Sequence, residues 1–141
     1  MTIPTNMREF NQALITEFRA NGGTLSGRLA NSHILLLTTV GAKSDLERTT
    51  PLGYGKDDDR FVVVAANAGA PKHPDWFLNL VAQPDVIVEV GSERFAARAR
   101  TAEGAEREDL IARQAEIVPW LPAQQEKTSR AIPIMVLERA G

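Results

Sequence analysis

Apolar residues near the N-terminus recur at intervals of three and four, which is the period of an amphipathic helix. These residues are Met7, Phe10, Leu14 and Phe18. The pattern predicts a helix from about residue 5 to residue 20, ended by Gly22 and Gly23. This helix either packs on the core or also touches a partner subunit or a membrane surface, because its polar face carries Arg8 and Arg19.

From His33 onward the residue pattern is typical of β-strands. The segments "HILLLTTV" and "RFVVVAAN" are apolar and rich in β-branched residues, whereas "DVIVEV" and "RFAARAR" alternate between apolar and polar positions. The turns "KDDD" at 56–59 and "GSE" at 91–93 predict two hairpins, so neighbouring strands should pair antiparallel.

Helical segments separate and follow these hairpins. In "PDWFLNLVAQP", Pro74 suits the first turn, Asp75 complements the helix dipole and Pro84 stops the helix. A further helix is predicted from Ala102 to about Ile117, interrupted by "VPWLP", and "AIPIMVLE" predicts a last strand in which Pro133 favours the start or an edge. The sum is an α+β fold: a half-open antiparallel barrel, at about 33–139, flanked by about three helices.

Composition narrows the class of protein. A chain of 141 residues, 43% hydrophobic and 24% charged, fits one domain over 1–141, with no apolar run of transmembrane length. The N-terminal segment lacks the features of a signal peptide, so a cytoplasmic location is expected. A formal charge of −2 argues against general binding to nucleic acid.

Several kinds of site are excluded by residue type. The chain has no cysteine, so disulfides and thiolate sites are ruled out, and its two histidines, His33 and His73, occur in no metal-binding motif. No serine stands on a G-x-S-x-G turn, and no phosphate-binding loop or G-x-G-x-x-G is present.

What remains is a site for an anion assembled from loops. Lys43 and Arg48 lie in the predicted first loop, 41–55, while Lys72 and His73 precede the helix near Pro74, whose first turn offers free N–H groups. The alternative is that these cations are ordinary solvated loop charges.

Small residues stand beside these cations. The run "AANAGAP", 65–71, follows a buried strand and would let a flat ring or a backbone come close. Trp76 on the following helix either covers such a ring or belongs to the core.

The order "GAKSDLERTTPLGYGKDDDRFVVVAANAGAPKHPDWFLNLVAQPDVIVEV", followed by "TSRAIPIMVLE", resembles the deazaflavin (coenzyme F420)-dependent nitroreductase family of split β-barrel proteins. The resemblance covers about 10–138. It implies an F420-dependent oxidoreductase in which the reduced deazaflavin passes a hydride to a hydrophobic, electron-poor acceptor such as a quinone, an enone or a nitro compound.

The resemblance also implies the residues that hold the cofactor. Lys43, Ser44 and Arg48 would lie near its anionic phosphate and glutamate tail, and three segments would continue the wall. Their members are Thr49, Thr50, Pro51, Leu52 and Gly53, then Val64, Ala65, Ala66 and Asn67, then Asp75, Trp76, Phe77, Leu78 and Asn79.

On the acceptor side the chain departs from the nitroimidazole-reducing members. Their serine and tyrosines correspond here to Ala66, Val118, Leu121 and Gln124, so nitro reduction is in doubt. The segment that contains Trp120 forms an apolar acceptor pocket in this interpretation, with Val118, Leu121 and Gln124 around it. Asn67 replaces a frequent lysine, for which Lys72 or Arg28 would compensate. No residue can be assigned as proton donor.

Two alternatives stay open at this point. One is a split-barrel reductase that binds FMN, and the other is a module that binds a deazaflavin or a quinone without turnover. Metal is expected in neither, and a homodimer is compatible with a small barrel that has an exposed edge.

Overall fold

The computed structural model describes residues 7–25, 33–42, 45–57, 59–65, 73–113, 126 and 132–140. Within them it has three helices and seven strands. The helices are α1 (Met7–Ala20), α2 (Asp75–Ala82) and α3 (Gly104–Arg113). The strands are β1 (Ile34–Val40), β2 (Glu47–Gly53), β3 (Gly55–Asp57), β4 (Arg60–Val64), β5 (Asp85–Val90), β6 (Glu93–Thr101) and β7 (Ile134–Arg139).

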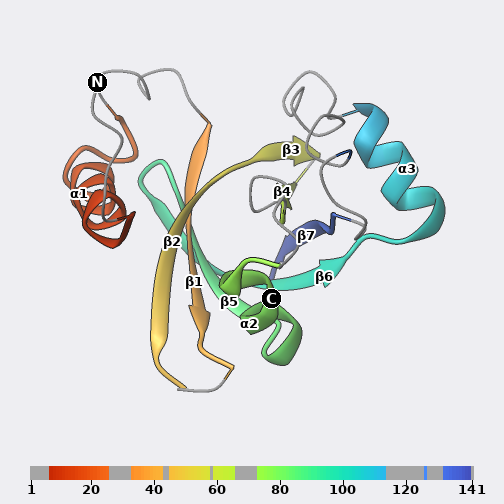
Figure 1. Ribbon diagram of the computed structural model, residues 1–141. Helices are drawn as coiled ribbons and strands as arrows, with labels where there is room; N and C mark the ends of the chain where they lie inside the picture. Colours follow the sequence, from red (N-terminus) through yellow and green to blue (C-terminus); the bar gives the residue numbers. More distant parts are fainter. Residues whose placement is uncertain are drawn as a thin grey trace.

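All seven strands form one curled antiparallel sheet in the order β2-β1-β5-β6-β7-β4-β3. Figure 1 shows β2 running on into β3, so that one long bent segment supplies both edges of the sheet. The predicted split barrel of an α+β protein is therefore confirmed, as are both predicted hairpins.

The inner face of the sheet holds the main core. It includes Leu35, Leu37, Val88 and Leu137, and α2 adds Trp76 and Leu80 to it. The opposite face is covered in two places: α1 packs over β1 through Phe18 and Leu36, and α3 packs over β4 and β7 through Leu110 and Val136. In Figure 1, α1 lies at the left of the sheet and α3 at the right, so the two helices cover different parts of this face.

The predicted N-terminal helix is present as α1 in the described part of the chain. Its end is set by Gly22 and Gly23, whose φ angles of 58° and 88° lie in the left-handed region that favours glycine. Ile15 and Phe18 are buried against the sheet, and Arg19 donates two hydrogen bonds to Glu89, of 3.0 and 2.8 Å. The large apolar side chains of α1 that the structure describes therefore face the protein. None of the described helices has the length and apolar character to cross a membrane.

The prediction of a loop over 41–55 is wrong for most of its length. Residues 47–53 form β2, which pairs with β1 along its whole length, and Arg48 lies in this strand opposite Thr39. The pattern did not indicate a strand here because proline has no backbone N–H to donate to a neighbouring strand, and Pro51 lies within the segment. It is tolerated because β2 is an edge strand.

The other proline and helix predictions hold with small shifts. Pro74 is the residue before α2 rather than inside its first turn, and Pro133 directly precedes β7, which is a central strand and no edge. Helix α3 occupies Gly104–Arg113, and the remainder of the helix expected to about Ile117 lies outside the described residues.

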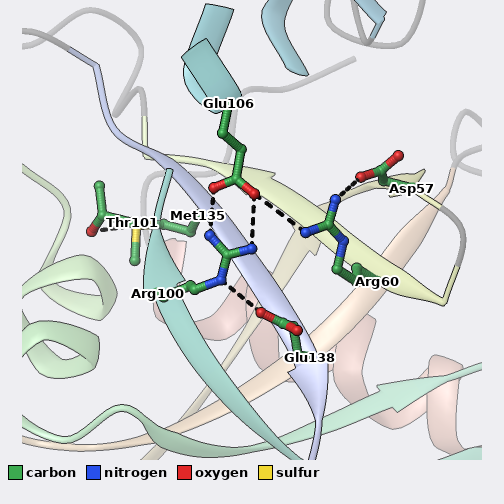
Figure 2. A network of polar contacts seen from close by, with 7 residues as sticks. All are labelled: Asp57, Arg60, Arg100, Thr101, Glu106, Met135 and Glu138. Carbon is green, nitrogen blue, oxygen red and sulfur yellow. Dashed lines mark hydrogen bonds and ion pairs between the residues drawn. The ribbon is translucent and has the colours of Figure 1, made fainter. Parts of the chain in front are cut away.

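A network of charges attaches α3 to the sheet (Figure 2). Glu106 of α3 accepts hydrogen bonds from Arg100 of β6, one of them 2.8 Å long, and from Arg60 at 3.3 Å. Arg60 also pairs with Asp57, and Arg100 donates to Glu138 at 2.6 Å. Hydrogen bonds from Arg100 hold the pKa of the Glu106 carboxyl below its ordinary value, so Glu106 stays ionised in the folded protein.

Candidate active site

The side chains of β2 divide between two environments. Residues directly opposite in an antiparallel pair share a face, and Pro51 lies opposite Leu36, which packs against α1. Thr49 lies on that same face, and its hydroxyl is 2.8 Å from the hydroxyl of Thr38. The side chains of Thr49 and Pro51 therefore face α1.

Arg48, Thr50 and Leu52 lie on the other face of β2. Their partners on β1 are Thr39, Leu37 and Leu35, of which the two leucines belong to the inner core. Leu52 is half-buried against this core, which also contains Trp76 of α2. Three of the predicted wall positions are thereby brought to the side of the sheet on which α2 packs.

Helix α2 presents three different faces. Trp76 and Leu80 point into the core, and Trp76 is only 9% exposed, so most of its surface is used for packing. Phe77 is half-buried, with its ring centroid 4.7 Å from that of His73, while Leu78 is 47% exposed. The sequence left Trp76 either in the core or over a ring, and its contacts are those of a core residue.

The start of α2 carries no side-chain cap. Pro74 precedes the helix in an extended conformation, and no side chain of the described residues hydrogen bonds to the N–H groups of the first turn. Asp75 in that turn is exposed. The N–H groups of Phe77 and Leu78 donate to the Pro74 carbonyl, so the donors at the helix start are the N–H groups of Asp75 and Trp76 together with the positive end of the helix dipole.

Arg48 differs in its partners from most of the arginines whose side chains the structure describes. Each of five others forms an ion pair with a carboxylate, and Arg107 donates to the carbonyl of Ile132. The five are Arg19, Arg60, Arg98, Arg100 and Arg139. Arg48 is exposed and forms no ion pair with any residue that the structure describes. The hydroxyl of Thr50 likewise has no partner among those residues, so both groups keep donors for a ligand.

Asn79 is buried and bonded within the protein. Its side-chain oxygen accepts from the backbone N–H of Ala42 at 3.0 Å, and its side-chain nitrogen donates to the Thr39 hydroxyl at 3.2 Å. Thr39 was missed by sequence reasoning. The signal was a polar residue inside the buried run "ILLLTTV", which requires a hydrogen-bond partner.

Val64, the last residue of β4, and Ala65, which follows it, lie on opposite faces. Ala65 is fully buried in the inner core, whereas Val64 packs with the cluster under α3. Gly53 ends β2 beside His33, whose ring meets the edge of Tyr54 with centroids 5.9 Å apart. Of these positions, only Ala65 shares the inner face with Arg48 and Thr50.

Several predicted residues lie outside the described part of the chain. They are Lys43, Ser44, Ala66, Asn67, Val118, Trp120, Leu121 and Gln124, together with Arg28 and Lys72. The predicted acceptor pocket belongs wholly to this set.

One hollow on the described surface, of about 430 Å³, lies elsewhere. It is lined by residues of β5, β6 and β7, among them Arg98 and Arg100. Both of these arginines are paired with carboxylates, Arg98 with Asp85 and Arg100 with Glu138. The hollow contains neither Arg48 nor any residue of α2, so it is separate from the candidate site.

Comparison with known proteins assigns the chain to a family. Residues 7–139 match the family model described as "F420H(2)-dependent quinone reductase". The chain belongs to this family. The predicted F420-dependent oxidoreductase and its cofactor are thereby confirmed, and the family description gives F420 rather than FMN.

Individual relatives agree with this assignment. The chain is 38% identical over 128 residues to an F420H(2)-dependent quinone reductase of Mycobacterium tuberculosis, covering 86% of this chain and 85% of that protein. A solved structure described as an F420-H2 dependent reductase is 38% identical, with a TM-score of 0.69 over 75% of this chain and 94% of that one. Another, described as a domain-swapped dimer, is 35% identical, with a TM-score of 0.72 over 94% and 96% of the two chains.

Proposed function

We propose that the protein reduces a quinone with F420H2 and holds the anionic tail of the deazaflavin at the inner face of β2, beside the start of α2. The observation that carries this proposal is the position of Arg48. It is a cation without an ion-pair partner among the described residues, and it stands opposite Thr39, the residue that Asn79 of α2 contacts.

The chemistry of the available groups fits such a tail. A guanidinium, a hydroxyl and uncapped backbone N–H groups are all donors, and donors are what phosphate and carboxylate oxygens require. These donors come from Arg48, Thr50 and the first turn of α2. Asp75 carries a negative charge, so we infer that it contributes its backbone N–H rather than its carboxylate.

Apolar surface lies next to these donors. Leu52 is half-buried over the core that Leu37 and Trp76 fill, and Ala65 is too small to occupy more space. The reduced deazaflavin supplies the hydride when it is bound. The task of these side chains is to orient a flat ring and to exclude water from it, which lowers the barrier for transfer without a strong acid.

Further members of the cofactor wall are proposed from the motif. Lys43 and Ser44 follow directly on Ala42, whose N–H is held by Asn79, so they would add a second cation and a hydroxyl to the donors of β2. Ala66 and Asn67 continue the chain from Ala65.

The acceptor class is proposed from the family and from composition. The stretch that includes Val118, Trp120 and Leu121 is apolar, and Gln124 stands where nitroimidazole-reducing members have an aromatic group. Such a lining suits a quinone better than a polar nitro compound. We assign no proton donor.

A homodimer is part of the proposal. A relative 35% identical is described as a domain-swapped dimer, and β2 and β3 are edge strands of the sheet. Light scattering after size-exclusion chromatography should give twice the mass of the 15.4 kDa chain. A single mass at all concentrations from 1 to 100 μM, equal to that of the chain, would contradict this part.

The test of function uses purified protein with reduced F420 and a panel of acceptors. We expect menadione to oxidise the cofactor in a protein-dependent reaction, faster than an enone or a nitroimidazole of similar size. The matched variants are Arg48→Gln and Arg94→Gln, because Arg94 also forms no ion pair within the described residues, and it lies on β6, which two strands separate from β2. Loss of cofactor binding in both variants, or in neither, would refute the proposed role of Arg48.

A further inference from the structure

Both polar atoms of the Asn79 side chain are hydrogen-bonded inside the protein, although the residue lies on the helix that borders the site. The side chain is 8% exposed, its oxygen accepts from Ala42 N–H, and its nitrogen donates to Thr39, which is 1% exposed. The side chain is buried, and its oxygen and its nitrogen are both turned toward protein partners. The geometry therefore gives Asn79 a role through Ala42 and Thr39.

The partner of Asn79 is the loop that joins β1 to β2. This loop is closed at its base by two backbone hydrogen bonds, from Gly41 N–H to the Leu46 carbonyl at 2.8 Å and from Asp45 N–H to the Gly41 carbonyl at 3.0 Å. Asp45 has a φ of 58°, as a tight reversal requires. Ala42 stands just inside this base, so the bond from Asn79 fixes the residue from which the chain enters Lys43 and Ser44.

Asn79 thus connects two sources of positive potential that neither element could align alone. Its helix carries the uncapped N–H groups of the first turn, one turn before Asn79, and its side chain accepts a hydrogen bond from the N–H of Ala42, two residues after β1. Because Thr39 lies opposite Arg48, the second hydrogen bond of the amide also ties the helix to the strand pair that presents Arg48.

We propose that Asn79 is a positioning residue: it ties Thr39 and Ala42 to α2, so that Arg48, opposite Thr39, and the N–H groups of the helix start keep one separation suited to the anionic tail of the deazaflavin. The proposal rests on the proposed function, since it assumes that the tail lies at these donors. Binding to a preformed set of donors avoids the cost of ordering these donors when the ligand arrives.

The main variant is Asn79→Leu, which keeps the approximate volume of the side chain and removes both hydrogen bonds. Amide hydrogen exchange in the ligand-free protein should show that Ala42 loses protection by at least tenfold. The dissociation constant for F420 should rise about tenfold, while that for the deazaflavin chromophore without its phosphate and glutamate tail should change less than twofold.

Two further variants each remove one hydrogen bond of Asn79. Thr39→Val removes the bond to β1 and leaves the bond to Ala42, so the dissociation constant for F420 should rise and that for the tail-less chromophore should stay within twofold of the original. Ala42→Pro removes the N–H that donates to Asn79 and leaves α2 intact. It should raise the dissociation constant for F420 about tenfold and leave that for the tail-less chromophore unchanged. It provides the test if Asn79→Leu does not fold.

The inference would be overturned if Asn79→Leu weakened both ligands equally, if it weakened neither, or if Ala42 kept its protection. Failure of the proposed function looks different. In that case Arg48→Gln would leave the ratio of the two dissociation constants unchanged, whatever happens to the exchange of Ala42.

Discussion

Two groups of arginines in this protein are used in different ways. On the α3 side of the sheet, Arg60 and Arg100 share Glu106, and each has a second carboxylate, Asp57 and Glu138 respectively (Figure 2). On the α2 side, Arg48 has no carboxylate partner among the described residues.

The difference separates charge that holds the fold from charge that is available to a ligand. A guanidinium whose donors are taken up by carboxylates has little left to offer an incoming phosphate. An exposed arginine without such partners contributes little to stability, and its donors are open. Pairing is thus a criterion for which cations of the protein belong to the site.

The largest expected effect concerns ligand affinity at Arg48. Replacing it by glutamine removes a charge-assisted contact, which is worth about 1.5–3 kcal/mol, or roughly a 10- to 100-fold rise in the dissociation constant for F420. The melting temperature should not move, because no ion pair within the described residues is lost. Fluorescence titration and a thermal melt of the same sample measure both quantities.

The reverse pattern is expected for Glu106→Gln. This variant leaves two guanidiniums without the negative charge that they share, so the melting temperature should fall by several degrees, while the F420 dissociation constant stays within twofold. A variant that melted like the original protein, or that lost cofactor affinity, would show that the charges of the two sides are not separate in function.

Acid should remove the contribution of Glu106 in a defined range of pH. The pKa of this carboxyl is lowered in the folded protein from its ordinary value of 4.5, mainly by hydrogen bonds from Arg100. A lowered folded pKa gives stability that is fully present above the ordinary value and is lost as the pH falls through the folded value. The free-energy difference of unfolding between the original protein and Glu106→Gln should therefore be constant from about pH 5 to pH 8 and shrink below about pH 4.

Chemical denaturation at a series of pH values checks this expectation. The matched control is Asp85→Asn, which alters a carboxylate paired with a single arginine. If the difference for Glu106→Gln grew on acidification, the sign of the coupling would be wrong.

The smallest effect is expected at the pair formed by Arg98 and Asp85. Their side chains are 67% and 79% exposed and their closest atoms are 3.3 Å apart. Such exposed pairs contribute less than about 1 kcal/mol to stability, and salt screens them. Arg98→Gln should therefore change neither the urea midpoint nor the cofactor affinity, and a clear loss of either would mean that the adjoining hollow is part of a site.

Much of the fold followed from periodicity, because each strand of the core has a strong local signal. "ILLLTTV" and "DVIVEV" gave β1 and β5, and glycines with left-handed φ ended α1 and formed the β5–β6 turn. The strand β2 was missed because it lies at an edge, contains Pro51 and is partly exposed on both faces, so neither alternation nor β propensity marked it.

The sequence predicted which segments contribute to the candidate site, but not which side chains of each segment point toward it. Sequence alone could not divide the run from Arg48 to Gly53, since a strand assigned as loop has no alternation of sides. The pairing of arginines was equally invisible, because Glu106 reaches Arg60 and Arg100 only once α3 has folded back over the sheet.

The central claim is that Arg48 grips the anionic tail of the deazaflavin rather than its ring. The most direct measurement is a pair of fluorescence titrations, with F420 and with the tail-less chromophore, of the original protein and of Arg48→Gln. We predict that the affinity of the variant for F420 is roughly 10- to 100-fold lower than that of the original protein, and that its affinity for the tail-less chromophore falls less than twofold. An equal loss for both ligands, or no loss for F420, would contradict the account.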